Sequence, residues 1–109
     1  MLKVSEGDIK RAVSDYLQYA QNQGLLYFSR LNSGIAYVKR GNRYYAIQLC
    51  EAGTADFFVL KAGRVIFLEI KSAKGKLRTE QKCFRTLVAS QLAEYYVIRD
   101  VSELAEILK

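Results

Sequence analysis

Glu69 and Lys71, separated by one residue, put a carboxylate and an ammonium in a stretch that otherwise predicts a buried strand. The run 65–71 is rich in β-branched and aromatic residues. Because successive side chains of a strand alternate between its faces, Glu69 and Lys71 share a face with Val65 and Phe67. Burying a charge is costly unless the charge is paired or coordinated. We therefore expect these two groups to have polar or ionic partners.

A second acid, Asp56, begins the preceding apolar run 56–60, and Ala62-Gly63 between the runs predicts a two-residue hairpin turn. Antiparallel pairing across that turn places Asp56 opposite Glu69, with Cβ atoms about 5 Å apart on one face of the sheet. Two adjacent carboxylates repel each other, and without a cation one of them is expected to hold a proton.

A divalent metal ion would relieve this repulsion, because Mg²⁺ prefers hard oxygen ligands of this kind. Lys71 lies on the same face, where its ammonium would stabilise a developing phosphoryl charge or orient a nucleophilic water. The two acids and the lysine together predict metal-assisted phosphoryl chemistry.

Composition limits the alternatives. The chain has no histidine, which excludes Ser-His-Asp and Cys-His catalysis, histidine-containing zinc sites and histidine-based nucleases. The 17 Lys and Arg residues against 11 Asp and Glu residues give a net charge of +6, which favours an acidic partner such as nucleic acid. Cys50 and Cys83 are isolated, and we expect both to be buried reduced thiols. We see no membrane span and no signal peptide, so we expect a cytoplasmic protein.

The pattern of elements predicts an α/β chain, an α+β arrangement in which helices flank a mixed sheet, in a single domain over residues 1–109. Ser5 and Asp8 resemble a capping box at the start of the first helix, Thr79 caps the second and Ser102 caps the last. Helices are expected at 6–22, at 79–91 and after 102, and strands at 25–30, 35–39, 43–49, 56–60, 65–71 and 95–99. The first three strands would form an antiparallel meander whose tip is basic. Its three cations, Lys39, Arg40 and Arg43, are candidate DNA-binding residues.

Asp56, followed thirteen positions later by Glu69-x-Lys71, resembles the PD-(D/E)XK nuclease superfamily, in which these residues lie on consecutive strands ahead of a helix. Gly53, three residues before the aspartate, and Gln81 on the following helix make the chain similar to the VRR-NUC family, the virus-type replication-repair nuclease domain. The resemblance covers almost the whole chain.

This resemblance implies a restriction-endonuclease-like fold and a DNA endonuclease that depends on Mg²⁺ or Mn²⁺. Branched DNA such as a Holliday junction is the candidate substrate, and a homodimer is the expected assembly. The resemblance implies these roles: metal ligation by Asp56, Glu69 and the backbone carbonyl of Ile70, catalysis by Lys71, an accessory acidic ligand in Glu6 and an active-site amide in Gln81. One departure is Ala55, where the family often has proline; its loss concerns the strand register more than the chemistry.

Simpler interpretations stand beside these roles. Asp56 alone could be a strand-entry residue bonded to nearby backbone, and Glu6 could serve the helix macrodipole at an N-terminus. A basic run after the E-x-K motif is commonly a solvated face, but here it adjoins the expected metal site, which favours contact with the phosphate backbone. That run contains Lys74, Lys76, Arg78, Lys82 and Arg85. The rival function is a non-catalytic DNA-binding or partner-binding module that keeps the nuclease fold for its basic surface.

Overall fold

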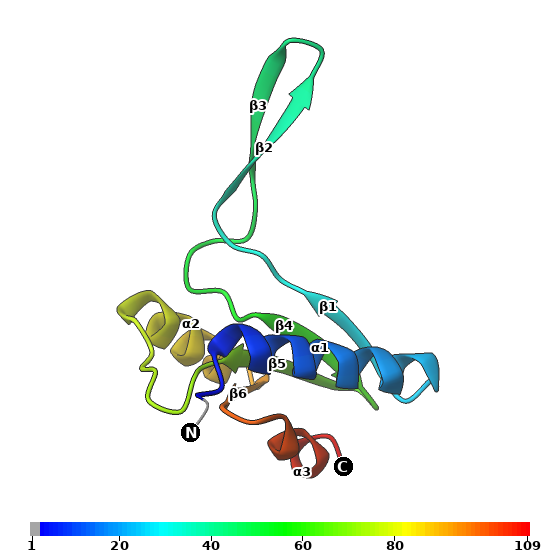
Figure 1. The fold of residues 1–109 in the computed structure, drawn as a ribbon. Helices are drawn as coiled ribbons and strands as arrows, with labels where there is room; N and C mark the ends of the chain where they lie inside the picture. Colours follow the sequence, from blue (N-terminus) through cyan, green and yellow to red (C-terminus); the bar gives the residue numbers. More distant parts are fainter. Residues whose placement is uncertain (1–2) are drawn as a thin grey trace.

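The computed structural model describes residues 3–109 and contains a mixed four-stranded sheet, a separate two-stranded hairpin, two long helices and a short helical C-terminus (Figure 1). The elements in chain order are α1 (Glu6–Asn22), β1 (Tyr27–Arg30), β2 (Ile35–Arg40), β3 (Arg43–Gln48), β4 (Phe57–Lys61), β5 (Arg64–Ile70), α2 (Thr79–Ser90), β6 (Glu94–Ile98), a 3₁₀ turn η1 (Val101–Glu103) and α3 (Leu104–Ile107). None of the helices in this range is long and apolar enough to cross a membrane.

The main sheet has the strand order β1-β4-β5-β6, in which β5 and β6 run parallel and the other pairs antiparallel. The predicted β4–β5 register is confirmed, because Phe58 lies opposite Phe67. Ala62 and Gly63 form the predicted two-residue turn, with φ values of 48° and 80°. Two positive φ values are typical of a type I′ turn, whose twist matches that of the flanking strands.

The predicted three-stranded meander is wrong. β1 pairs with β4 instead of β2, while β2 and β3 pair only with each other and form a hairpin outside the main sheet. The pairing of β1 with β4 brings Phe28 against Phe57 in the core, with ring centroids 6.3 Å apart. Neither β2 nor β3 has a buried residue, so pairing with them would not have buried Phe28. Burial of apolar surface therefore accounts for the pairing that the local turn signals did not predict.

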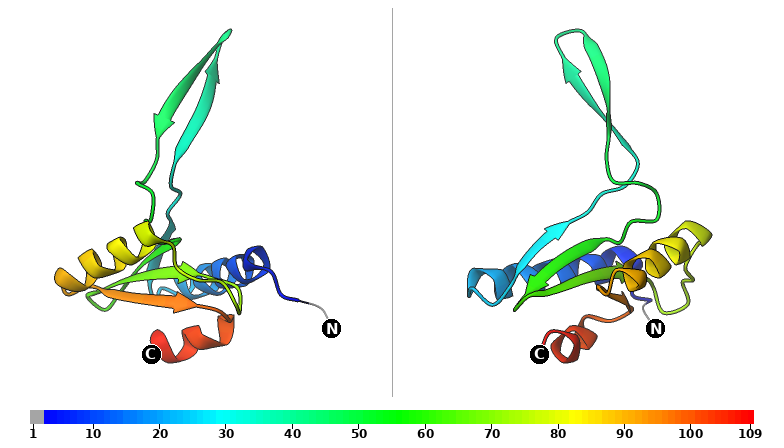
Figure 2. Two further views of the ribbon diagram at one scale, coloured as in Figure 1. Left: turned by 90° about the vertical axis from the view of Figure 1, so that its left-hand side faces the viewer. Right: turned by 180° about the vertical axis from the view of Figure 1, so that it is seen from behind.

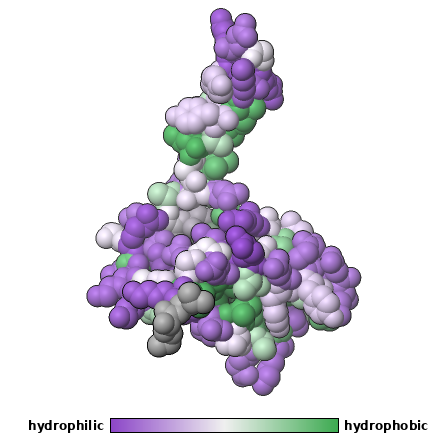
Figure 3. All heavy atoms as spheres, in the orientation of Figure 1, coloured by the Kyte–Doolittle hydropathy of each residue, from purple (hydrophilic) through white to green (hydrophobic). Residues whose placement is uncertain are grey.

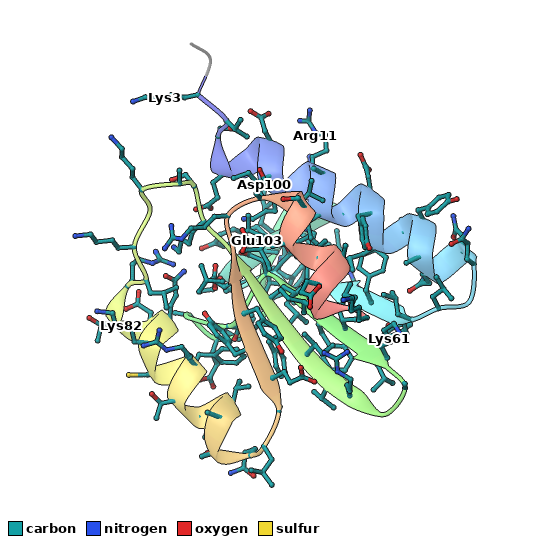
Figure 4. The ribbon with its side chains drawn as sticks, turned by 90° about the horizontal axis from the view of Figure 1, so that it is seen from below. Lys3, Arg11, Lys61, Lys82, Asp100 and Glu103 are labelled. Carbon is teal, nitrogen blue, oxygen red and sulfur yellow. The ribbon has the colours of Figure 1, made fainter. Side chains whose placement is uncertain are left out.

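The two long helices cover opposite faces of the sheet (Figure 4). α1 buries Ile9, Val13 and Leu17, spaced four residues apart, against the apolar face of β4 and β5. Its predicted capping box is present: the Asp8 amide donates to Ser5 Oγ (3.1 Å), and the Ser5 amide donates to Asp8 Oδ2 (3.2 Å). The cap and the buried stripe fix where α1 begins and which way it faces.

α2 packs on the other face through aromatic edges. Phe84 lies 5.2 Å from Phe67 and 6.0 Å from Tyr95, measured between ring centroids. Sequence reasoning placed the cap of α2 one residue late, because Arg78 is the N-cap residue and its backbone amide donates to Gln81 Oε1.

Two further local predictions are wrong. Asp100, and not Ser102, caps the C-terminal turn, since its carboxylate accepts a hydrogen bond from the Ser102 amide (2.8 Å). Cys83 is exposed and Cys50 half-buried, so neither is the fully buried thiol that was expected. Cys83 lies on the outer side of α2. Its apolar character and apolar neighbours in the sequence were therefore not a sufficient basis for predicting that its side chain faces the core.

Gly53, the glycine of the G-x-x-D pattern, sits where the chain passes against the first turn of α2. Its φ is +93°, and a Cβ at this position would collide with the backbone carbonyl of Glu80. Gly34 has nearly the same φ, +95°, but a Cβ there would meet nothing within 4 Å. The two glycines therefore separate the effect of backbone strain from that of a close approach.

We expect Gly53→Ala to lower the free energy of unfolding more than Gly34→Ala does. Positive-φ strain costs each variant about 1–3 kcal/mol, and overpacking adds about 1–3 kcal/mol at position 53 alone. Urea unfolding followed by far-ultraviolet circular dichroism measures both. Equal losses for the two variants would mean that the chain can move away from α2 at little cost.

Candidate active site

The candidate site lies at the end of the main sheet where β4 begins and β5 ends. Asp56 precedes β4, and its Oδ2 accepts a 2.7 Å hydrogen bond from the backbone amide of Ile70 at the end of β5. Its carbonyl accepts a 2.8 Å hydrogen bond from the Leu31 amide at the end of β1. Asp56 therefore ties three segments together, and its carboxylate is held against the strand that carries Glu69.

Glu69 is buried, with 3% of its surface exposed, and Oε1 has no hydrogen-bond partner. Burial, followed by the hydrogen bond to Asp56 and the Asp56 charge, raises the pKa of Glu69 to about 8, although the Lys71 charge lowers it. The expected apposition of the two carboxyl groups is thus present. An unpartnered carboxylate oxygen inside a protein is costly, and it is a suitable ligand for a cation.

Lys71 is also buried, with 8% of its surface exposed, and its backbone amide donates to the Ile98 carbonyl of β6 at 3.0 Å. Within residues 3–109, no carboxylate oxygen lies within 4.0 Å of its ammonium. Lys71 therefore acts on Glu69 through space and not as a direct ion-pair partner. Its ammonium stays available to an anion that enters the site.

Lys10, which sequence reasoning missed, also contacts the site. Its ammonium lies 3.2 Å from Asp56 Oδ1 and 3.8 Å from Glu6 Oε2. Lys10 follows Ile9 on α1, so it sits at the border of the buried stripe, and one quarter of its side chain is exposed. Nothing local in the sequence marks it, since the contact depends on how α1 crosses the start of β4.

We expect Lys10→Met to raise the affinity of the site for Mn²⁺ roughly 3- to 10-fold, because a cation that competes for Asp56 is removed. Methionine retains most of the apolar stem. Titration of free Mn²⁺ by electron paramagnetic resonance measures the change, and Arg11→Met, on an exposed neighbouring position of α1, is the control. Unchanged affinity would mean that Lys10 and the metal do not share Asp56.

The remaining predicted metal ligands are Glu6 and the backbone carbonyl of Ile70. The charge of Glu6 helps to raise the pKa of Glu69, so Glu6 is near the site, but its nearest cation is Lys10. In the described part of the chain, no three acidic, histidine or cysteine side chains gather closely enough to hold a metal ion by themselves. A metal here would be held by Asp56, Glu69 and backbone or water oxygens, with the Ile70 carbonyl as the predicted backbone ligand. This oxygen-only donor set fits Mg²⁺ or Mn²⁺.

Gln81 is buried in the first turn of α2, with 5% of its surface exposed. Its Oε1 accepts a 2.8 Å hydrogen bond from the Arg78 amide, one half of a capping box. This bond explains the burial of the side chain without any substrate. The active-site role of Gln81 stays a prediction, and its amide nitrogen is the atom that could serve it.

Tyr95, on β6, is a second residue that sequence reasoning missed. Its hydroxyl is buried without a hydrogen-bond partner. Burial raises the pKa of Tyr95, the charges of Glu69 and Asp56 raise it further, and the charge of Arg85 lowers it. The tyrosine, the two acids and Arg85 therefore lie in one electrostatic neighbourhood, which the parallel pairing of β6 beside β5 creates.

The predicted basic run follows β5 and forms an exposed rim. Arg99 organises it by donating from Nη1 to the carbonyls of Ser72 and Gly75, both at 2.7 Å. Arg78 has a carboxylate oxygen of Glu80 at 3.8 Å, a surface contact of little energy. The rim residues, all exposed, are Lys74, Lys76, Arg78, Lys82 and Arg85. Lys39, Arg40 and Arg43 do not belong to it, because they lie on the separate β2–β3 hairpin.

In comparisons with known proteins, the chain matches no protein-family model, and no curated protein is significantly similar to it.

Proposed function

We propose that the chain is a metal-dependent phosphodiesterase that acts on DNA. The observation that supports the proposal most directly is the interaction of the Asp56 carboxyl group with the buried Glu69 carboxyl group, near the charge of Lys71. Glu69 Oε1 has no hydrogen-bond partner there. Such a pair is destabilising on its own and favourable around a divalent cation. A carboxylate pair with one nearby lysine is the chemistry that in-line hydrolysis of a phosphodiester needs.

More specifically, we propose a DNA endonuclease with the PD-(D/E)XK fold, similar to the VRR-NUC family. The sheet order β1-β4-β5-β6 with α1 and α2 on opposite faces supports this fold, since it puts the aspartate and the E-x-K motif on adjacent strands. Branched DNA as substrate and a homodimer as assembly are parts of the same proposal that follow from the resemblance. The net charge of +6 and the exposed basic rim support a nucleic acid partner.

In this mechanism Asp56 and Glu69 would hold the metal, which when bound would lower the pKa of a water and polarise the phosphate. The Ile70 amide fixes the Asp56 carboxylate by its 2.7 Å hydrogen bond, so the acid is oriented before the substrate arrives. Lys71 provides a positive charge beside the phosphoryl oxygens. Lys74, Lys76 and Lys82, on the exposed rim, would hold the neighbouring phosphates.

The test is a cleavage panel of four-way junction, flap, linear duplex and single-stranded DNA, each with Mg²⁺, Mn²⁺ or EDTA. We expect cleavage with either metal and none in EDTA. Equal cleavage in EDTA would contradict the metal-dependent mechanism, and a four-way junction cut no faster than linear duplex would contradict the branched substrate.

The second candidate is a DNA-binding module without catalysis. The ion pair of Lys10 with Asp56 and the capping bond of Gln81 favour it, since each gives a proposed active-site residue a structural role. In that case the chain would bind the panel substrates and cut none of them in any metal.

A further inference from the structure

The hairpin formed by β2 and β3, residues 35–48, is hereafter called the arm. It stands clear of the rest of the molecule in all three ribbon views (Figures 1 and 2). Its strands pair along their whole length, from Ile35 opposite Gln48 to Arg40 opposite Arg43, and close through Gly41-Asn42, where Gly41 has a φ of 62°. A positive φ at the first loop residue is typical of a type II′ turn. The arm is thus a regular two-stranded ribbon.

The tip of the arm carries three cations and the arm has no acidic residue. Lys39, Arg40 and Arg43 are exposed, and none of them has a carboxylate oxygen within 4.0 Å in the described part of the chain. Below the tip the surface turns hydrophobic (Figure 3). An isolated two-stranded ribbon is at best marginally stable in water, so we expect the arm to be ordered by a partner.

The register divides the cations between the two faces of the ribbon. Arg40 and Arg43 are paired with each other and lie on one face, while Lys39 is paired with Tyr44 on the other. The Lys39 ammonium lies 5.8 Å from the centre of the Tyr44 ring, which steadies it near the tip. An anionic partner that faces both sides of the ribbon at once would neutralise all three charges.

Duplex DNA is such a partner. Its major groove admits a two-stranded β-ribbon, and a phosphate backbone borders the groove on each side. A second copy of the arm suits the tip less well, because it would add three like charges and no carboxylate. The exposed tyrosines beside the cations, Tyr37 and Tyr44, add hydroxyl groups that can donate hydrogen bonds to phosphate oxygens.

The arm is rooted beside the candidate active site. The Leu31 amide, just after β1, donates to the Asp56 carbonyl at 2.8 Å. The Gly34 amide donates to the Cys50 carbonyl at 3.1 Å, and the Cys50 amide donates to the Asn32 carbonyl at 2.9 Å. The arm therefore projects from the end of the sheet that carries the acids.

We propose that the arm inserts its tip into the major groove of duplex DNA, with Lys39 and the two arginines on opposite faces contacting the two bordering phosphate backbones. The proposal rests on the proposed function in taking DNA as the partner, but it does not require cleavage. The arm would position duplex flanking the site, and its contribution would be to binding.

The test compares the affinity of wild type and of Lys39→Gln/Arg40→Gln/Arg43→Gln for a linear duplex in EDTA, at several salt concentrations, by fluorescence anisotropy. We expect the slope of log affinity against log salt to fall in magnitude by about 2 to 3, because each lost phosphate contact contributes about 0.9. We expect the affinity at low salt to fall at least about tenfold.

The matched control is Arg11→Gln/Lys61→Gln/Lys109→Gln, which removes the same charge from exposed or half-exposed positions away from the arm. Arg11 and Lys61 are labelled in Figure 4. The control should lose little affinity. The charge-conserving variant Lys39→Arg/Arg40→Lys/Arg43→Lys should retain the wild-type slope, because charge sets the slope, and matching far-ultraviolet circular dichroism spectra of all variants should exclude misfolding. A tip variant that loses no more than the control would overturn the proposal.

A second copy as the partner of the arm gives a different result. Val38→Asp, on the apolar part of the arm, would then convert a dimer to a monomer in sedimentation velocity, while the tip variant would keep its wild-type salt slope. That pair of results would also overturn the proposal. Failure of the cleavage panel leaves this binding test unaffected, so loss of the proposed function and loss of the proposed arm contact are distinguishable.

Discussion

Glu69→Gln and Asp56→Asn should each lower the rate of metal-dependent DNA cleavage on the order of 10³-fold while changing duplex affinity in EDTA less than about twofold. Both substitutions keep the size of the side chain and remove its negative charge. The metal would lose half of its charged ligands in either case. We propose that DNA binding depends instead on the exposed rim and on the arm, neither of which contains these acids.

The two variants differ in what else they disturb. Asp56→Asn also weakens the bond to the Ile70 amide and the ion pair with Lys10, so it should lower thermal stability. Glu69→Gln removes a destabilising charge and should not. Single-turnover cleavage in Mg²⁺, with Asp15→Asn on an exposed position of α1 as control, separates these effects. Wild-type rates in either purified site variant would exclude the proposed mechanism.

Local signals in the sequence predicted the parts of the fold that local physics determines. The register of β4 and β5 follows from a turn of two residues, and each residue of the strands has only one facing partner once that turn is set. The start of α1 follows from the Ser5 and Asp8 side chains, which satisfy amides within the same turn. The apposition of Asp56 and Glu69 is a consequence of that register, so it too could be predicted.

The parts that were wrong or missed depend on residues distant in sequence. β1 pairs with β4 although the whole arm lies between them in the sequence, and burial of Phe28, not a turn, decides this pairing. Lys10 reaches Asp56, 46 positions later, only because of the angle at which α1 crosses the sheet. Tyr95 joins the acids through the parallel pairing of β6, whose connection contains all of α2. No periodicity or motif carries such information.

Gly53 has a structural role that its position in the sequence motif did not reveal. In the sequence it contributed to the family resemblance through its position three residues before an acid. In the structure it lets the segment leading to Asp56 pass against the Glu80 carbonyl at a backbone conformation that other residues adopt with strain. The same contact fixes the start of α2 relative to the acid, so a residue without a side chain helps to set the geometry of the site.

The second large effect is on stability in the absence of metal. The pKa of Glu69 is raised from 4.5 to about 8, so between these values the folded protein binds a proton that the unfolded chain has released. Stability therefore falls as pH rises through this window and levels off above pH 8. A shift of this size corresponds to at most about 5 kcal/mol, and on the order of 2 kcal/mol is expected after relaxation around the ionised group.

The window distinguishes Glu69 from the other shifted acids. Ion pairing with Arg64 lowers the pKa of Glu94 to about 2, so the stabilisation from Glu94 is complete above pH 4.5 and is lost only as pH falls toward 2. Asp8 and Asp100 have pKa values shifted in the same downward direction, each by hydrogen bonds at a helix start. Between pH 5 and 8 the loss of stability should therefore come from Glu69.

In EDTA, then, wild type should unfold at a lower urea concentration at pH 8 than at pH 5. The unfolding midpoint of Glu69→Gln should show no such decline, and this variant should be the more stable protein at pH 8. Mg²⁺ should reverse the order, because a bound cation favours the ionised carboxylate and stabilises only the folded state. Glu51→Gln, an exposed acid next to the arm, should behave as wild type throughout. A wild-type midpoint that stays constant from pH 5 to 8 would mean that Glu69 is ionised in the folded protein without a metal. Repulsion between the two carboxylates could then not be the reason that the site binds a metal ion.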